Sequence, residues 1–143
     1  EINILINKYA GFSNVDRVIY SLALKIYEKN PLSAQNYFNI LQNKYPDSIY
    51  SVKSNIIYGN LNFEKKNYDK AISYYEKFLN SNIETDKGLA YYNLILSNYY
   101  LKRFERIVEI IKKIKIPVLD ENQWREIPLI HARSYYHLKN YNI

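Results

Sequence analysis

The chain contains no cysteine and no methionine, and it has only three glycines and four prolines among 143 residues. Without cysteine, a disulfide framework, a thiolate zinc site and a thiol nucleophile are all excluded. So few glycines and prolines do not suit the many turns of a β-sandwich or barrel, whereas the long stretches between them suit helices. These absences predict an all-α fold. Because residue 1 is not methionine, we also expect the chain to be a fragment of a longer protein.

Long apolar runs and a one-sided charge pattern are missing as well. No run approaches the roughly 20 residues of a membrane-spanning helix, and no signal peptide opens the chain. The formal net charge is +6, which raises the question of a nucleic-acid or anionic-membrane partner. However, Glu105 and Glu109 interrupt the densest basic cluster at helical spacing. That cluster comprises Lys102, Arg103, Arg106, Lys112, Lys113 and Lys115. Such interleaving indicates a solvated helix face, so we do not expect a nucleic-acid partner.

What the chain does have is an internal repeat. The phrase KKNYDKAISYYEKFL in 65–79 recurs as LKRFERIVEIIKKI in 101–114, YYHLKNYNI in 135–143 opens it again, and EKNPLSAQNYFNIL in 28–41 carries an earlier copy. In this register, the residues that open the second helix of each unit are 37, 36 and 37 positions apart: Pro31, Tyr68, Phe104 and Tyr141. A period of this size in a helical chain predicts stacked helical hairpins.

The clearest of these units keeps two small residues, Gly59 and Ala71, among large aromatic side chains. A glycine inside a helix costs about 1 kcal/mol of helix propensity relative to alanine, so close packing must return more than this. Two antiparallel helices approach closely where a small side chain of one faces the other. We therefore expect Gly59 to lie inside a helix and to mark, with Ala71, the contact between the two helices of the unit.

These positions resemble the tetratricopeptide repeat (TPR). Its pattern has a small residue in the first helix, an aromatic residue near the start of the second, then alanine, a further aromatic residue and often proline in the exit turn. The matching positions are Ala34, Phe38, Leu41 and Pro46, then Gly59, Tyr68, Ala71, Tyr75 and Phe78, then Phe104, then Ala132, Tyr135 and Tyr141. The third unit departs from the pattern, with Ile95 for the glycine and Ile107 for the alanine. The resemblance implies a right-handed superhelical solenoid of antiparallel helix pairs with about three and a half repeats.

The repeat register also divides the chain. Residues 1–14 are expected to be an N-terminal segment or the end of a preceding helix, and residues 15–143 to form the TPR-like domain. Its units lie near 15–48, 49–85, 86–122 and 123–143, and the last is incomplete because the chain stops where its second helix should begin. Helices are expected near 14–29, 31–45, 49–66, 68–81, 85–101, 103–116 and 127–139, with an irregular stretch at 117–126.

The resemblance further implies where a partner binds, namely on the concave face that the first helices of successive units form. Carried over by register, this face receives Ile56, Asn60, Phe63, Tyr92, Leu96, Tyr99, Leu129, Arg133 and Tyr136. Because most of these are apolar or aromatic, an apolar segment or amphipathic helix of another protein suits the face better than an acidic tail. The alternative is that tight curvature, or the apolar segment 2–9, already fills the groove.

The link KYPDSIYS, residues 44–51, carries a finer resemblance. Pro46 cannot continue the preceding helix, and Ser48 or Asp47 can cap the next one. A Tyr-Pro-Asp-Ser exit turn together with this period resembles the TPR proteins of bacterial envelopes, of the type of the outer-membrane assembly lipoprotein and the periplasmic coordinator of the Tol system. This resemblance implies a place in the bacterial periplasm or envelope, with the cytoplasm as the alternative.

Residues suited to catalysis or metal binding are sparse. The two histidines, His131 and His137, are six residues apart and so lie on different helix faces, not at the i, i+4 spacing of a metal pair. No glycine-rich loop is present to hold a phosphate, and no phrase of serine, histidine and aspartate indicates nucleophilic catalysis. The sequence therefore predicts no enzyme activity, no catalytic residue, no cofactor and no metal. It favours a protein-binding scaffold.

Three other functions stay open as alternatives. A basic, tyrosine-rich helical domain could bind nucleic acid by stacking. A cytoplasmic co-chaperone-like adaptor grips a terminal carboxylate with lysine and asparagine; Asn60 and Asn93 fit that pattern, but Ile56 stands where it needs lysine. Finally, the incomplete last repeat allows the chain to pair with a second copy of itself.

Overall fold

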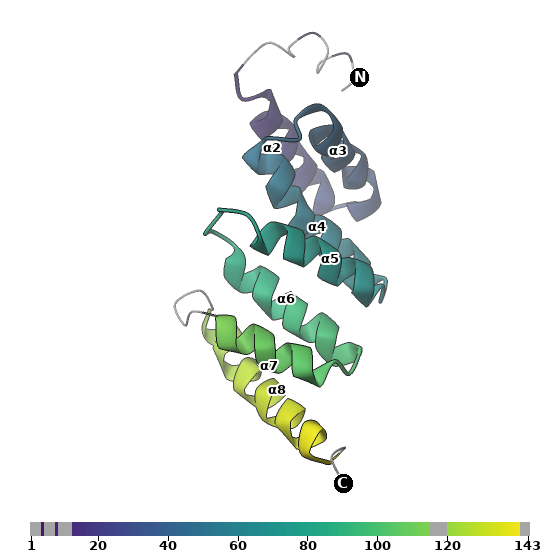
Figure 1. Cartoon of the computed structure of the whole chain (residues 1–143). Coiled ribbons are helices and arrows are strands. Elements are labelled where there is room, and N and C mark those ends of the chain that lie inside the picture. Colours follow the sequence, from purple (N-terminus) through teal and green to yellow (C-terminus); the bar gives the residue numbers. More distant parts are fainter. Residues whose placement is uncertain (1–3, 5–7, 9–12, 115–119, 141–143) are drawn as a thin grey trace. The chain divides into compact units, whose positions relative to one another are not determined.

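The computed structural model describes residues 4, 8, 13–114 and 120–140 of the chain. Within these residues it contains seven α-helices and no strand (Figure 1). The helices are α2 (Val15–Tyr27), α3 (Pro31–Lys44), α4 (Ile49–Glu64), α5 (Tyr68–Leu79), α6 (Lys87–Tyr100), α7 (Phe104–Lys113) and α8 (Glu121–Asn140). The expected all-α helical repeat fold, with about three and a half repeats, is confirmed.

The chain forms two compact units, Glu1–Ser54 and Asn55–Ile143, with the boundary inside α4. In the first unit, α2 and α3 pack against each other. The buried residues of this pair are Ile19 and Ala23 on α2 with Ala34, Phe38 and Leu41 on α3. A cap begins the next helix, because the Tyr50 N–H donates to Ser48 Oγ at 3.1 Å. Of the two residues predicted to cap this helix, Ser48 and Asp47, it is Ser48 whose side chain accepts this bond.

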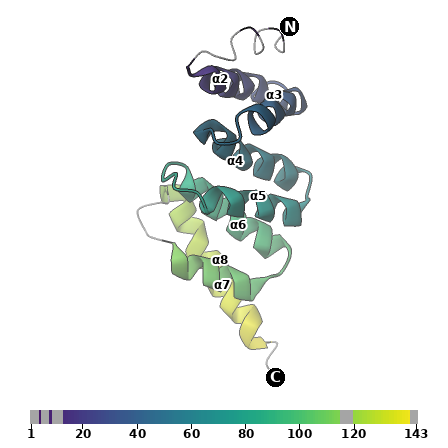
Figure 2. The ribbon, with the colours of Figure 1, turned by 45° about the horizontal axis from the view of Figure 1, so that its top comes forward.

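In the second unit, consecutive helices from α5 to α8 pack on one another, and α6 also contacts α8 (Figure 2). They share one core cluster, which comprises Ala71, Ile72, Tyr75, Leu94, Ile95, Phe104, Ile107, Ile110, Ile127 and Ile130. Burial of this apolar surface is what stabilises helices of such length, because isolated helices of 10 to 14 residues are marginal in water.

The repeat is visible in the backbone as well as in the sequence. Helices α3, α5 and α7 begin at Pro31, Tyr68 and Phe104, as predicted. The turns before α5 and α7 share one conformation, since Lys66 and Lys102, 36 residues apart, have left-handed φ values of 59° and 56°. The following amides donate to carbonyls five residues back at 2.8 and 2.9 Å, Asn67 to Asn62 and Arg103 to Asn98. The backbone hydrogen bonds of the turn thus repeat with the same 36-residue spacing as the sequence.

Gly59 lies inside α4, as expected, but its closest neighbour is the ring of Tyr75 and not Ala71. A Cβ added to Gly59 would lie 2.6 Å from Cδ1 and 2.8 Å from Cζ of that ring, and nearer still to Cε1. Tyr75 itself is fully buried. The glycine therefore makes room for a large ring on the partner helix, while Ala71 is buried in the same core.

Two expectations for the last unit need correction. Helix α8 begins at Glu121 instead of near 127, and it holds Pro128 in its interior. A proline inside a helix removes one backbone hydrogen bond and costs about 3 kcal/mol, but Ile127 and Ile130 beside it are buried in the core and offset that cost. Ala132, expected at the small packing position, is exposed, and the buried small residue of α8 is Ser134. Tyr141 and most of 1–14 lie outside the described residues.

Candidate functional site

The nine residues predicted to face a partner lie on three helices of the second unit, and the structure separates them by exposure. On α4, Ile56 is buried while Asn60 and Phe63 are half-buried. On α6, Tyr92, Leu96 and Tyr99 are all half-buried. On α8, Leu129, Arg133 and Tyr136 are exposed. The predicted face is therefore covered over α4 and α6 and open on α8.

The α4 and α6 residues owe their burial to the core. Phe63, Tyr92, Leu96 and Tyr99 all pack against the core cluster of the second unit. A side chain that packs on a core contributes to folding whether or not it also touches a partner. Replacing these aromatic residues therefore tests stability before it tests binding.

Asn60 is held by two neighbouring helices. Its Oδ1 accepts a hydrogen bond from the Tyr75 hydroxyl at 2.9 Å and another from Asn93 Nδ2 at 3.1 Å. The first bond fixes the ring that lies over Gly59, and the second joins α4 to α6. Ile56, at the position where a carboxylate clamp needs lysine, is buried and supplies no cation, and this argues against the co-chaperone alternative.

Tyr92 forms a comparable link between α6 and α8. Its hydroxyl donates a hydrogen bond to Glu126 Oε2. Burial, followed by the hydrogen bond and the charge of Glu126, raises the pKa of Tyr92 to about 12. Tyr92 is therefore a neutral hydrogen-bond donor at physiological pH, and it fixes the start of α8 to α6.

The exposed part of the predicted face is a row along α8. Leu129 is 52% exposed and Tyr136 is 65% exposed. Ala132 and Arg133, also exposed, lie between them at helical spacing of three and four residues. The row, defined here as Leu129, Ala132, Arg133 and Tyr136, presents apolar and aromatic surface around one positive charge. Contiguous exposed apolar surface is typical of protein interaction sites.

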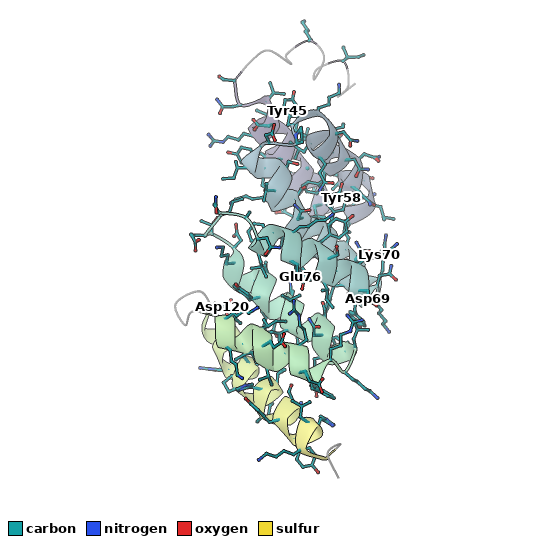
Figure 3. All side chains as sticks on the ribbon, viewed as in Figure 1. Tyr45, Tyr58, Asp69, Lys70, Glu76 and Asp120 are labelled. Atoms are coloured by element: carbon teal, nitrogen blue, oxygen red, sulfur yellow. The ribbon has the colours of Figure 1, made fainter. Side chains whose placement is uncertain are left out.

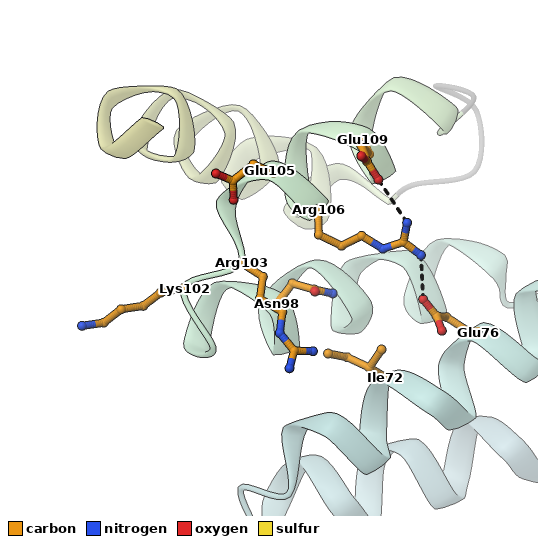
Figure 4. A pocket seen from close by; sticks show the side chains of 8 residues that line it. All are labelled: Ile72, Glu76, Asn98, Lys102, Arg103, Glu105, Arg106 and Glu109. Atoms are coloured by element: carbon orange, nitrogen blue, oxygen red, sulfur yellow. Dashed lines mark hydrogen bonds and ion pairs between the residues drawn. The ribbon is translucent and has the colours of Figure 1, made fainter. Parts of the chain in front are cut away.

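A hollow of about 580 Å³ lies where α5, the end of α6 and α7 meet (Figure 4). It is lined by Ile72, Glu76, Asn98, Lys102, Arg103, Glu105, Arg106 and Glu109. Arg106 bridges two carboxylates, Glu76 at 2.9 Å and Glu109 at 3.1 Å. The hydrogen bond to Glu76 is the main cause that raises the pKa of Arg106 above its ordinary value.

A second ion pair joins the same helices nearby, since Arg103 lies 2.6 Å from Asp69. Asp69 and Glu76, labelled in Figure 3, both belong to α5. Exposed ion pairs contribute roughly 0–1 kcal/mol each. These contacts therefore add little to the stability of the fold, and their main effect is to orient α5 against α7. The basic cluster read from the sequence as a solvated helix face is thus partly neutralised by acidic neighbours of the same chain.

Sequence reasoning missed one further hollow, of about 280 Å³, whose lining is mainly aromatic. Its residues are Tyr99, Tyr100, Lys102, Phe104 and His137, from the end of α6, the following turn, the start of α7 and the end of α8. The sequence signal was the three aromatic residues around LKR, Tyr99 and Tyr100 before it and Phe104 after it. The contribution of His137 depends on how α8 packs.

Two absences hold for the part of the chain that the structure describes. No group of three or more histidine, cysteine, aspartate or glutamate side chains there could hold a metal ion. No helix in the same ranges is long and apolar enough to cross a membrane.

These features define a helical repeat protein whose helix pairs recur at intervals of 36 or 37 residues. Within it, residues 57–82 match the sequence model of the tetratricopeptide repeat. The matched segment covers the second part of α4 and all of α5, which is the unit that holds Gly59 and Tyr75. Searches of curated proteins and of solved structures returned no significant match. The match supports a TPR protein, and this repeat is typical of protein–protein interaction scaffolds.

Proposed function

We propose that the chain is a non-catalytic scaffold that binds an apolar or amphipathic segment of a partner protein on the face formed by α4, α6 and α8. The observation that carries the proposal is the exposed row on α8. Its apolar members Leu129 and Tyr136 occupy the same positions of the repeat as the half-buried residues of α4 and α6. Because the core already covers most of the α4 and α6 positions, the α8 row supplies most of the contact area.

The composition of the row favours an amphipathic helix as the occupant. Leu129 and Tyr136 are seven residues apart, about 10 Å along the helix axis, which is the reach of two turns of a partner helix. Aromatic and arginine side chains are the types that most often dominate binding energy at interfaces. Arg133 between the two apolar residues would pair with an acidic residue of the partner helix.

A photo-crosslinking amino acid tests the proposal in cells. Placed at Tyr136 in the full parent protein, it should capture a partner protein. At Ser73, an exposed position on α5, it should capture none. The double variant Leu129→Asp/Tyr136→Asp should then lose at least tenfold in affinity for the captured partner without loss of helicity. Equal capture at both positions, or unchanged affinity of the double variant, would contradict the proposed face.

A second copy of the chain is the other protein that could occupy the row. Sedimentation equilibrium distinguishes the two occupants. We expect a monomer at 100 µM, and a dimer that Tyr136→Asp dissociates would show that the row is a self-association surface.

We also propose that the complex belongs to the bacterial cell envelope. The support is the Tyr-Pro-Asp-Ser turn at 45–48, in which Ser48 caps α4 and donates to Asp16 Oδ2 at 2.6 Å. Fractionation of the native cells checks this, because recovery with the cytoplasmic fraction would overturn it.

A further inference from the structure

None of the four residues of the α8 row lines the aromatic hollow at the end of α6, although Tyr136 contacts its His137. Its volume of about 280 Å³ falls just below the range of about 300–1,000 Å³ that drug-sized ligands occupy. It therefore has room for one ring. Residues 99–104 and the distant His137 of the second unit build it, so it exists only in the folded protein.

The rings that line the hollow are already oriented by one another. Phe104 stacks on His137 with ring centres 4.4 Å apart and planes 7° from parallel. Tyr99 meets Phe104 edge to face at 6.2 Å and 71°. These are the arrangements that aromatic pairs prefer, so an inserted ring would meet fixed faces and edges.

Tyr100 supplies the most accessible wall. It stacks on Tyr68 at 4.9 Å with planes 11° apart, and its ring meets the edge of Phe63 at 5.8 Å. Nevertheless 56% of Tyr100 is exposed. A large ring that is held in position while most of its surface faces water is preorganised for stacking, because binding need not order it.

The charge at the rim selects the sign of the ligand. Lys102 lines the hollow from a left-handed turn residue, and its N–H bonds to the Tyr99 carbonyl at 3.0 Å. Figure 4 shows its side chain extending away from the Arg106 ion pairs. Unlike Arg103 and Arg106, Lys102 forms no ion pair with any residue that the structure describes. An ammonium group at the rim repels a cationic ligand and attracts an anionic one.

We propose that this hollow binds an aromatic side chain that lies next to a carboxylate in a partner segment. The ring enters between Tyr100 and Phe104, and the carboxylate pairs with Lys102. This deepens the proposed function and rests on it only in that the occupant belongs to a partner protein.

The test uses N-acetyltryptophan as a probe that carries both groups. In a titration followed by backbone amide NMR, shift changes should concentrate at 99–104 and 136–138. N-acetyltryptophanamide, which lacks the carboxylate, should bind at least fivefold more weakly. Lys102→Met should remove that difference between the two probes. Tyr100→Ala should weaken both at least tenfold, whereas Tyr135→Ala, an exposed tyrosine outside the hollow, should weaken neither.

Several results would overturn the assignment. They are an absence of shift changes at these amides, equal binding of the two probes, or tighter binding of tetramethylammonium or oligothymidine than of N-acetyltryptophan. The spectrum of Tyr100→Ala shows whether that variant folds. If it does not fold, the variant Lys102→Met, at an exposed residue, still tests the proposal. Binding of the probe without crosslinking at Tyr136 would contradict only the proposal for the α8 row. Crosslinking at Tyr136 without binding of the probe would contradict only the proposal for the hollow.

Discussion

The α4–α5 unit and the α6–α7 unit share the conformation of the turn between their helices but pack different side chains at the same register. In the first, Gly59 lies under the buried ring of Tyr75. In the second, 36 residues later, Ile95 is fully buried and Ile111 packs on the core in the place of the tyrosine. One small and one large residue are thus exchanged for two of middle size.

This difference fits the position of the match to the repeat model, which lies at residues 57–82 in the α4–α5 unit. A sequence model records residue types, and Gly59, Ala71 and Tyr75 carry the expected ones. The helix pair itself needs only that the space between the helices be filled. The turns at Lys66 and Lys102 have the same conformation because backbone dihedral angles and backbone hydrogen bonds define it, not the side chains that differ between the two units.

The largest expected effect is at Ile95. Ile95→Ala should lower the free energy of unfolding by about 2–5 kcal/mol, because it leaves a cavity in a fully packed core. Urea denaturation measures it. The matched control on the same helix is Leu89→Ala, at a residue 42% exposed, which should cost under about 1 kcal/mol. Equal losses for both variants would mean that Ile95 does not fill the helix contact.

Gly59→Leu should cost about 1–3 kcal/mol or more, since the added atoms overlap the buried Tyr75 ring. Helix propensity alone predicts a gain in stability of up to about 1 kcal/mol. The sign of the measured change therefore distinguishes steric overlap from helix propensity. The double variant Gly59→Ile/Tyr75→Ile imports the pair found in the next unit, and it should lose less stability than Gly59→Ile alone. A double variant less stable than Gly59→Ile alone would contradict the idea that the two units fill the same space with different side chains.

Tyr75→Phe should cost about 0.5–1.5 kcal/mol, because it removes one hydrogen bond to Asn60. Asn60 keeps its bond to Asn93, which limits the loss. Thermal unfolding measures the change. In the variant Asn60→Leu, which places at 60 the residue found at 96, Tyr75→Phe should have a smaller effect, and an undiminished effect would show that the hydroxyl acts elsewhere.

The smallest effect is expected at the two turns. Lys66→Gly and Lys102→Gly should each raise stability by up to about 1 kcal/mol, because glycine adopts a positive φ at no steric cost but loses more backbone entropy on folding. Since the turn geometry repeats, the two gains should agree within about 0.5 kcal/mol. A gain at one turn and a loss at the other would show that the units differ in backbone strain.

Much of the fold was predictable from particular residues. Pro31, Tyr68 and Phe104 marked helix starts because each opens the same repeated phrase. The start of α8 was missed because Pro128 reads locally as a boundary, whereas the burial of Ile127 and Ile130 beside it depends on the rest of the unit.

The sequence by itself determined the helical class, the period and the residue that must be small. Helical spacing acts between near neighbours along the chain, and the repeated pattern of small and large residues reveals the contact between the two helices of a unit. Tertiary structure alone decided that Phe63 and Tyr92 pack on the core while Leu129 and Tyr136 stay exposed. It also decided that His137 joins Tyr99 and Phe104 around one hollow. The physical reason is that exposure and pocket shape depend on how helices cross and which neighbours cover each face, and a repeat period does not specify either.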